Sequence, residues 1–189
     1  ASGAAGTGYA PGGTGVAGNG GRGGAGGNGG IGGSGAETVI VTVQNNGINA
    51  WGGWATATYG QTFTPAANSA LQSFEFTTRA NSGTGVQTYT AYLYQWNAGS
   101  STVTGPALWS GNGSLTTTSQ FTPTVITLGA ASPQLTAGTQ YVFFLTTVGN
   151  TKSSASFYFG AAYPGTYPGG YFVFNNNTEV MTIDGRTPG

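Results

Sequence analysis

The chain has 189 residues, of which 37 are glycine, and its formal net charge at pH 7 is zero. Charged residues make up 4% of the sequence, against about 25% in a typical globular domain, so the sequence has no basic cluster that would indicate nucleic-acid binding. Histidine and cysteine are absent, which removes the usual general base, thiol nucleophile, disulfides and zinc ligands, and no apolar run reaches the ~18 residues of a membrane span.

Residues 1–36 form a Gly-rich segment that holds 18 of the glycines. Every third residue from Gly12 to Gly33 is glycine, and a second glycine register joins from Gly20, so two edges of a threefold polyproline II helix would carry no side chain. Bare edges let backbones of other chains approach and form hydrogen bonds. We expect an ordered, polyglycine II-like segment, although a flexible linker fits the same composition. The residues predicted for assembly are Gly20, Gly21, Gly23, Gly24, Gly26, Gly27, Gly29, Gly30, Gly32 and Gly33.

Residues 37–189 are predicted to form an all-β domain, a jelly-roll-like β-sandwich. Short runs rich in Thr, Val, Tyr and Phe alternate here with turns of Gly, Pro, Asn and Ser, and no run has a helical period with caps. The expected strands are 38–44, 54–64, 71–78, 87–96, 107–111, 121–128, 140–147, 154–160, 171–175 and 179–183.

Two of the expected strands, 87–96 and 140–147, are apolar on both faces, whereas 71–78 alternates. The apolar side chains on both faces of such a strand must be buried against other protein atoms. Another layer of the same chain or a neighbouring subunit could supply these atoms. The strand 38–44 follows the Gly-rich segment directly, so it could also complete the sheet of a neighbouring copy.

Catalytic chemistry has few candidate residues. The carboxylates are Glu37, Glu75, Glu179 and Asp184, and the last two would lie ~17 Å apart on an extended strand, beyond the ~5–9.5 Å between glycosidase carboxylates. The stretches 175–179 and 182–186 offer oxygen ligands without the acidic density of a dedicated calcium site. We expect no enzymatic activity, no cofactor and no bound metal.

Aromatic residues between 51 and 54 and between 163 and 171 suggest a carbohydrate-binding surface. Trp51 and Trp54 flank two glycines, and Tyr163, Tyr167 and Tyr171 recur at a spacing of four between Pro-Gly turns. Exposed aromatic faces stack on sugar rings, which makes these five residues candidates for glycan stacking. The same residues suit the ends of the sandwich or contacts between subunits, where an apolar body and a polar tip both find partners.

Three phrases resemble secreted bacterial β-sandwich proteins, many of which carry the C-terminal sorting signal called PEP-CTERM. These phrases are "LYQWNAGSSTVTGPALWSG" (93–111), "LTAGTQYVFFLTT" (135–147) and "YPGGYFVFNNNTE" (167–179). The resemblance covers most of residues 55–180 and implies export, often with an association with exopolysaccharide and biofilm matrix. It brings no functional residues with it. This chain departs from the family in its Gly-rich start and in its end at "DGRTPG". Residues 12–35 separately resemble the threefold Gly-rich segments of phage tail-fibre adhesins.

The sequence predicts a structural subunit of an extracellular filament or biofilm matrix fibre that assembles with itself. The start at Ala1 suits removal of a signal peptide, and so an extracellular or cell-surface location. Its expected partners are other copies of itself and extracellular polysaccharide, with no nucleic acid and no membrane span. The alternative is a carbohydrate-binding or adhesive module, including the phage tail-fibre type, on a Gly-rich stalk.

Overall fold

The computed structural model describes residues 46–53, 55–161, 167–176 and 185–188. The chain divides into two units, Ala1–Val39 and Ile40–Gly189, and every described residue belongs to the second. The Gly-rich segment and the expected strands 38–44 and 179–183 lie outside the described residues. Twelve strands and one short 3-10 helix, Gly129–Ala131, make up the described regular structure, which contains no α-helix. The all-β prediction is confirmed there.

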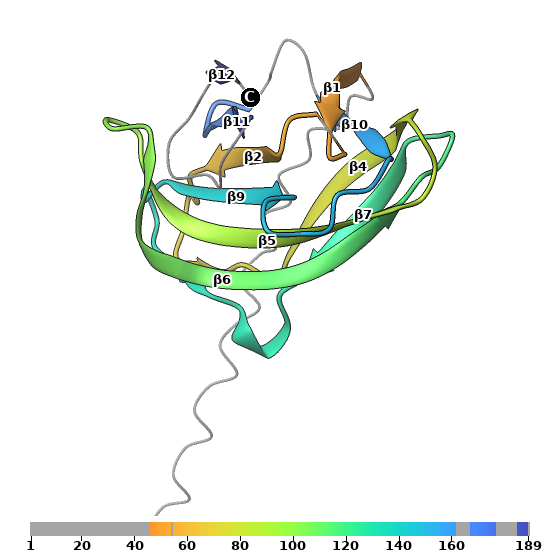
Figure 1. Ribbon diagram of the computed structural model, residues 1–189. Coiled ribbons are helices and arrows are strands. Elements are labelled where there is room, and N and C mark those ends of the chain that lie inside the picture. Colours follow the sequence, from red (N-terminus) through yellow and green to blue (C-terminus); the bar gives the residue numbers. More distant parts are fainter. Residues whose placement is uncertain (1–45, 54, 162–166, 177–184, 189) are drawn as a thin grey trace, which may run out of the picture. The chain divides into compact units, whose positions relative to one another are not determined.

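The strands form two antiparallel sheets and one small pair (Figure 1). The four-stranded sheet has the order β1 (Asn46–Trp51), β10 (Ser156–Ala161), β4 (Ser73–Ser82) and β7 (Thr122–Thr127). The six-stranded sheet has the order β12 (Gly185–Pro188), β11 (Tyr171–Asn175), β2 (Thr58–Phe63), β9 (Tyr141–Thr146), β5 (Val86–Asn97) and β6 (Thr102–Thr116). The pair consists of β3 (Ser69–Ala70) and β8 (Gln134–Leu135).

The first ten strands pair in a nested order, as the two arms of one long hairpin would, and the pairs are distributed among the sheets. β5 pairs with β6, β4 with β7, β3 with β8, β2 with β9 and β1 with β10, all antiparallel. Further pairings of β10 with β4 and of β9 with β5 join these pairs into the two large sheets. β11 then extends the six-stranded sheet along β2, and β12 follows β11.

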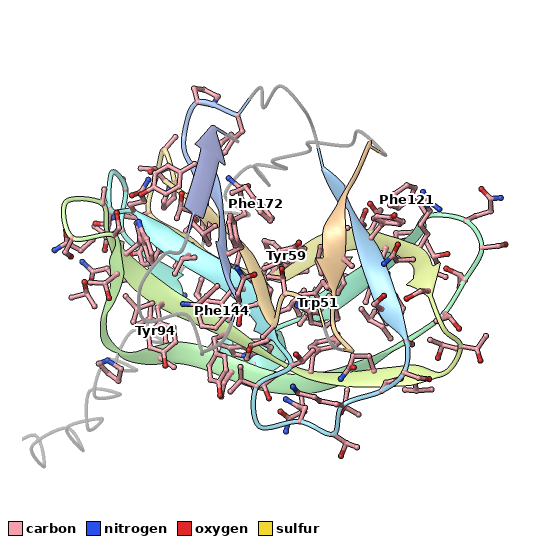
Figure 2. The ribbon with its side chains drawn as sticks, turned by 45° about the horizontal axis from the view of Figure 1, so that its top comes forward. Trp51, Tyr59, Tyr94, Phe121, Phe144 and Phe172 are labelled. Carbon is pink, nitrogen blue, oxygen red and sulfur yellow. The ribbon has the colours of Figure 1, made fainter. Side chains whose placement is uncertain are left out.

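Aromatic contacts between the two large sheets build the core. Phe74 of β4 stacks on Phe143 of β9 with ring centroids 3.9 Å apart, and Phe159 of β10 meets Tyr59 of β2 edge-on at 5.4 Å. Trp51, at the end of β1, is fully buried in the same cluster (Figure 2). Because one apolar cluster takes its members from both sheets, the arrangement is that of a β-sandwich.

Strand β9 is buried on both faces, as its sequence predicts. Phe143 and its alternate neighbours lie in the core between the sheets. Phe144 and Val142 point to the opposite face, where they form a second apolar cluster with Trp96 and Val173. The six-stranded sheet is therefore apolar on its inner face and, around β9, on its outer face.

Several strands differ from the sequence prediction, and the short strands β3, β8 and β12 match none of the expected ranges. β6 runs over fifteen residues, Thr102–Thr116, where a strand at 107–111 was expected. β1, Asn46–Trp51, was not expected as a strand. In contrast, β11 has the predicted bounds, 171–175.

Candidate functional site

Trp51 is not available for stacking on a sugar, and that prediction is corrected. The side chain is fully buried, and its ring lies 5.3 Å from Phe159 and 6.2 Å from Tyr89. Gly52 and Gly53 both have positive φ, which lets the chain turn sharply after Trp51. A Cβ on Gly53 would also lie 2.9 Å from the carbonyl oxygen of Ala155. The two glycines of "WGGW" thus serve a tight turn that leaves the first indole in the core.

The predicted tyrosine row does not form one surface. Tyr167 packs against the core between the sheets, and its hydroxyl accepts a hydrogen bond from the Thr64 backbone N–H at 3.2 Å. Tyr171 lies on the outer face of the six-stranded sheet, where its hydroxyl accepts a hydrogen bond from Trp96 Nε1 at 2.7 Å. Trp54 and Tyr163 lie outside the described residues, as do the ten glycines predicted for assembly.

The outer face of the four-stranded sheet carries an arginine between two aromatic rings. The guanidinium carbon of Arg79 lies 4.7 Å from the ring centroid of Tyr158 and 5.2 Å from that of Phe121. Both distances lie within the ~6 Å of a cation–π contact. Arg79 and Tyr158 face each other across β4 and β10, and all three side chains are half-buried. The sequence gives no signal for this group because its members come from separate segments.

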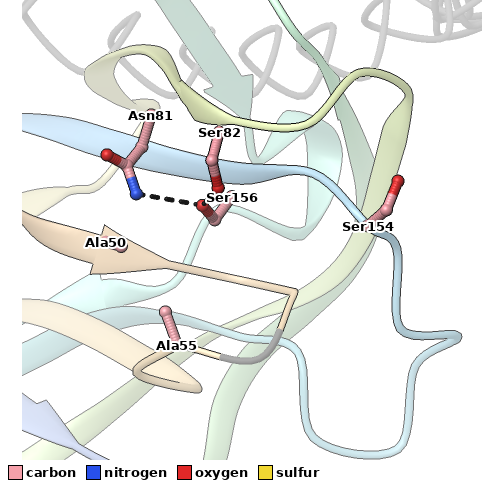
Figure 3. Close-up of a pocket in the computed structure, with 6 residues that line it drawn as sticks. All are labelled: Ala50, Ala55, Asn81, Ser82, Ser154 and Ser156. Carbon is pink, nitrogen blue, oxygen red and sulfur yellow. Dashed lines mark hydrogen bonds between the residues drawn. The ribbon is translucent and has the colours of Figure 1, made fainter.

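A small polar pocket lies at the ends of the same two strands (Figure 3), where Asn81 and Ser156 are each two residues along the strand from Arg79 and Tyr158. Its volume is about 280 Å³, close to the lower limit of ~300 Å³ for small-molecule sites. Ser156 is the centre of its polar wall, since its hydroxyl lies 3.1 Å from Asn81 Nδ2 and 2.9 Å from Ser82 Oγ. The residues that line the pocket are Ala50, Ala55, Asn81, Ser82, Ser154 and Ser156.

A buried glutamine holds the two loops that border this pocket. Gln87 of β5 is fully buried, and its Oε1 accepts hydrogen bonds from the backbone N–H groups of Gly53 and Ser153, each at 3.1 Å. Its Nε2 donates to the carbonyl oxygens of Thr88 and Thr151 at 2.8 and 3.0 Å. One side chain therefore fixes the turn after β1 and the loop before β10.

Aromatic side chains also gather on the outer face of the six-stranded sheet. Tyr94 lies parallel to Phe144, with ring centroids 5.9 Å apart, and Tyr92 lies 5.3 Å from the same ring (Figure 2). Phe144 is buried, whereas the two tyrosines are half-buried. The alternation of Tyr92, Tyr94 and Trp96 along β5 predicts an apolar second face, and this face includes Tyr171 of the predicted stacking residues.

Charge is sparse throughout the described part of the chain. Its charged residues are Glu75, Arg79, Lys152 and Arg186. Glu75 is exposed on the outer face of the four-stranded sheet, where it lies opposite Val125 of β7. Within the described ranges, no group of three or more acidic, histidine or cysteine residues could hold a metal ion, and no helix is long and apolar enough to cross a membrane.

Comparisons with known proteins give no match. No protein-family model, no curated protein and no solved structure matches this chain. What the protein does is therefore inferred from its own residues. Two features are available for that inference: the nearly uncharged surface, and the polar pocket with the adjacent aromatic stack.

Proposed function

We propose that this protein is a structural subunit of an extracellular filament or matrix fibre that assembles with copies of itself. The observation that carries the proposal is the near absence of charge, 4% of residues, on a chain with zero net charge. A surface without net charge gives little repulsion between copies and favours association. The bare backbone edges expected in residues 1–36 supply a second means of contact.

We further infer that the body of each subunit is a jelly roll. In that fold, a long hairpin of nested antiparallel pairs is rolled so that successive pairs alternate between two sheets. The nested pairing of β1 through β10 and the two strand orders support this inference. The resemblance of residues 93–111, 135–147 and 167–179 to exported β-sandwich proteins supports a location outside the cell.

Sedimentation velocity of the full chain at micromolar concentration, with electron microscopy of the same sample, tests the proposal. We expect polymers of increasing length as the concentration rises. The variant Gly27→Val places a side chain on a bare edge of the threefold segment and should block growth. Asn28→Val is the matched control, because position 28 already carries a side chain in that register. A monodisperse monomer from the unmodified chain would contradict the proposal.

A second candidate function, carbohydrate binding, is favoured by the polar pocket beside the Arg79 stack. Sugar sites combine aromatic faces with amide and hydroxyl groups, and Tyr158 lies two residues along β10 from Ser156, which forms the polar wall of the pocket with Asn81. A glycan array tests it. Binding should be lost in Tyr158→Ala and Asn81→Ala and kept in Thr136→Ala, an exposed change away from the pocket. No binding across a broad array would contradict this function.

A further inference from the structure

The edges of the two large sheets differ in how well they are protected against pairing with another chain. Natural sheets protect their edges with proline, charge, bulges or short strands. β7 contains Pro123, β12 has four residues and ends at Pro188, and the pairing of β1 is interrupted between Ile48 and Trp51. Each of these edges has at least one protective feature.

The edge strand β6 lacks such protection over Trp109–Thr116. These eight residues pair without interruption with Leu93–Val86 of β5 and include no proline and no charged residue. The register shift in the β5–β6 pair lies outside this stretch, between Leu93 and Gln95. Half of the backbone N–H and C=O groups of an edge strand face away from its partner. Among the described residues no strand pairs along the other side of β6, so over ~27 Å, at 3.4 Å per residue, this edge is a template for another strand.

The side chains of this stretch leave room for a partner strand to approach the edge of β6, on both faces of the sheet. The exposed side chains are small and uncharged: Ser110, Asn112, Ser114 and Thr116. The inward positions hold Trp109, Gly111, Gly113 and Leu115, and the rings of Trp109 and Tyr89 cover the two glycines. A partner strand would therefore meet neither a like charge nor a bulky outward side chain.

We propose that a second copy of this chain pairs antiparallel along Trp109–Thr116, around a two-fold axis at Asn112. This inference rests on the proposed self-assembly and names one contact of it. In this register Ser110 faces Ser114 of the second copy, Gly111 faces Gly113, and Trp109 faces Leu115. The stretch is thus complementary to itself, and the two six-stranded sheets become one continuous sheet.

Such a two-fold contact closes on itself and produces a dimer. An open fibre therefore needs a second, different contact, which the proposed function assigns to the Gly-rich segment. The dimer made through β6 is the repeating unit of the fibre.

Disulfide trapping in the full chain tests this contact, because the natural chain has no cysteine. Facing residues of antiparallel strands have Cα atoms ~4.5–5.5 Å apart, within disulfide reach. Under mild oxidation, Asn112→Cys should yield a covalent dimer on a non-reducing gel. A mixture of Ser110→Cys and Ser114→Cys should cross-link between the two variants far more than either does alone. Thr136→Cys, exposed and distant in sequence, should remain monomeric on the gel.

A charge variant provides a second measurement. The double substitution Ser110→Lys and Ser114→Lys sets like charges opposite each other twice in the dimer, and both sites are exposed, so the fold is kept. Its dimer affinity should fall about tenfold. The matched double variant Thr136→Lys and Ala137→Lys, on exposed sites outside β6, should leave the affinity unchanged.

The outcomes separate this contact from the proposed function. Polymers that form without any cross-link through β6 would overturn the edge contact and leave self-assembly in place. A cross-link from Asn112→Cys to Val41→Cys, in place of a second Asn112→Cys, would overturn it in favour of a strand from residues 38–44. An unmodified chain that stays monomeric would overturn both the contact and the proposed function.

Discussion

At the scale of single residues, Gln87 shows how a protein with few charged residues fixes its loops. Its buried amide uses both lone pairs and both N–H groups in hydrogen bonds to the backbone of four residues. A charged side chain at this place would carry a large desolvation penalty, whereas a fully satisfied amide does not. The turn after Trp51 and the loop at Ser153 are thus both held by one uncharged side chain.

We predict that Gln87→Met lowers the free energy of unfolding by about 2–5 kcal/mol. Methionine has a similar length but leaves the buried N–H groups of Gly53 and Ser153 without an acceptor. Urea unfolding measures the change. Gln95→Met, at an exposed position of the same strand, is the control and should change stability by less than about 0.5 kcal/mol. Equal effects of the two substitutions would show that the buried amide has no special role.

Tyr89 makes stability depend on pH in the alkaline range. Burial raises the pKa of its phenol above the usual value of about 10 because the phenolate is poorly solvated in the core. The unfolded chain therefore releases this proton first, and stability should be constant below about pH 10 and decline above it. Urea unfolding at pH 8, 9, 10 and 11 measures this decline. Tyr89→Phe should make it shallower, and an identical slope in the variant would contradict the assignment.

At the scale of the strands, glycine has a packing role that a sequence pattern does not separate from its role in turns. In β6, Gly111 and Gly113 provide space for the rings of Trp109 and Tyr89, so the strand continues through residues that usually interrupt one. In β2, Gly60 lies between Phe144 and Val173 on the outer face of the six-stranded sheet. These glycines are packing residues inside strands.

We predict that Gly60→Ala destabilises the fold by about 1–3 kcal/mol. The added methyl group would lie 2.7 Å from the carbonyl oxygen of Phe143, so the backbone of β9 would have to move. The measurement is the midpoint of thermal or urea unfolding. Ser110→Ala, an exposed change in β6, is the reference and should be nearly neutral. A neutral Gly60→Ala would mean that β2 and β9 can separate at little energetic cost.

The sequence predicts most of the described strands and little of the candidate sites. Phe74 and Phe76 alternate with exposed Glu75, so β4 is evident from its period of two. β3 and β8 have two residues each, too few for any period, and Gly105, Pro106, Gly111 and Gly113 mask the length of β6. The Arg79 stack and the pocket depend on which strands become neighbours, and the sequence does not determine that. The burial of Trp51 depends on the turn at Gly52, so the sequence alone does not separate a stacking residue from a core residue there.

At the scale of the whole molecule, the six-stranded sheet has an apolar cluster on each face, and the chain has few charged residues. The core between the sheets stabilises the domain, and the outer cluster around Phe144 adds a second apolar layer. With four charged residues in the described part, the proposed contacts between copies would depend on backbone hydrogen bonds and on apolar and small polar side chains.

We predict that self-association changes little between about 0.05 and 0.5 M sodium chloride, because screening acts on charges that this surface lacks. Sodium sulfate should strengthen association, since it is excluded from protein surfaces and favours burial. Sedimentation velocity across the two salt series measures both effects. Dissociation of the assembly by sodium chloride would point to ion pairs at the contacts and contradict this expectation.

Because Asn46 pairs with Ala161 at the outermost rung of the nested hairpin, synthesis and folding of this chain are coupled in time. A ribosome releases β1, β2 and β4 well before it has made β10, β9 and β7, and those early strands must wait unpaired. The first pair complete in both strands is β5 with β6, joined by a short turn, so we expect folding to begin in the middle of the chain and to proceed toward both ends. Where many ribosomes translate one message, the unpaired early strands of neighbouring nascent chains would most readily pair with each other. Slower translation, which releases one chain at a time, would prevent this exchange of strands.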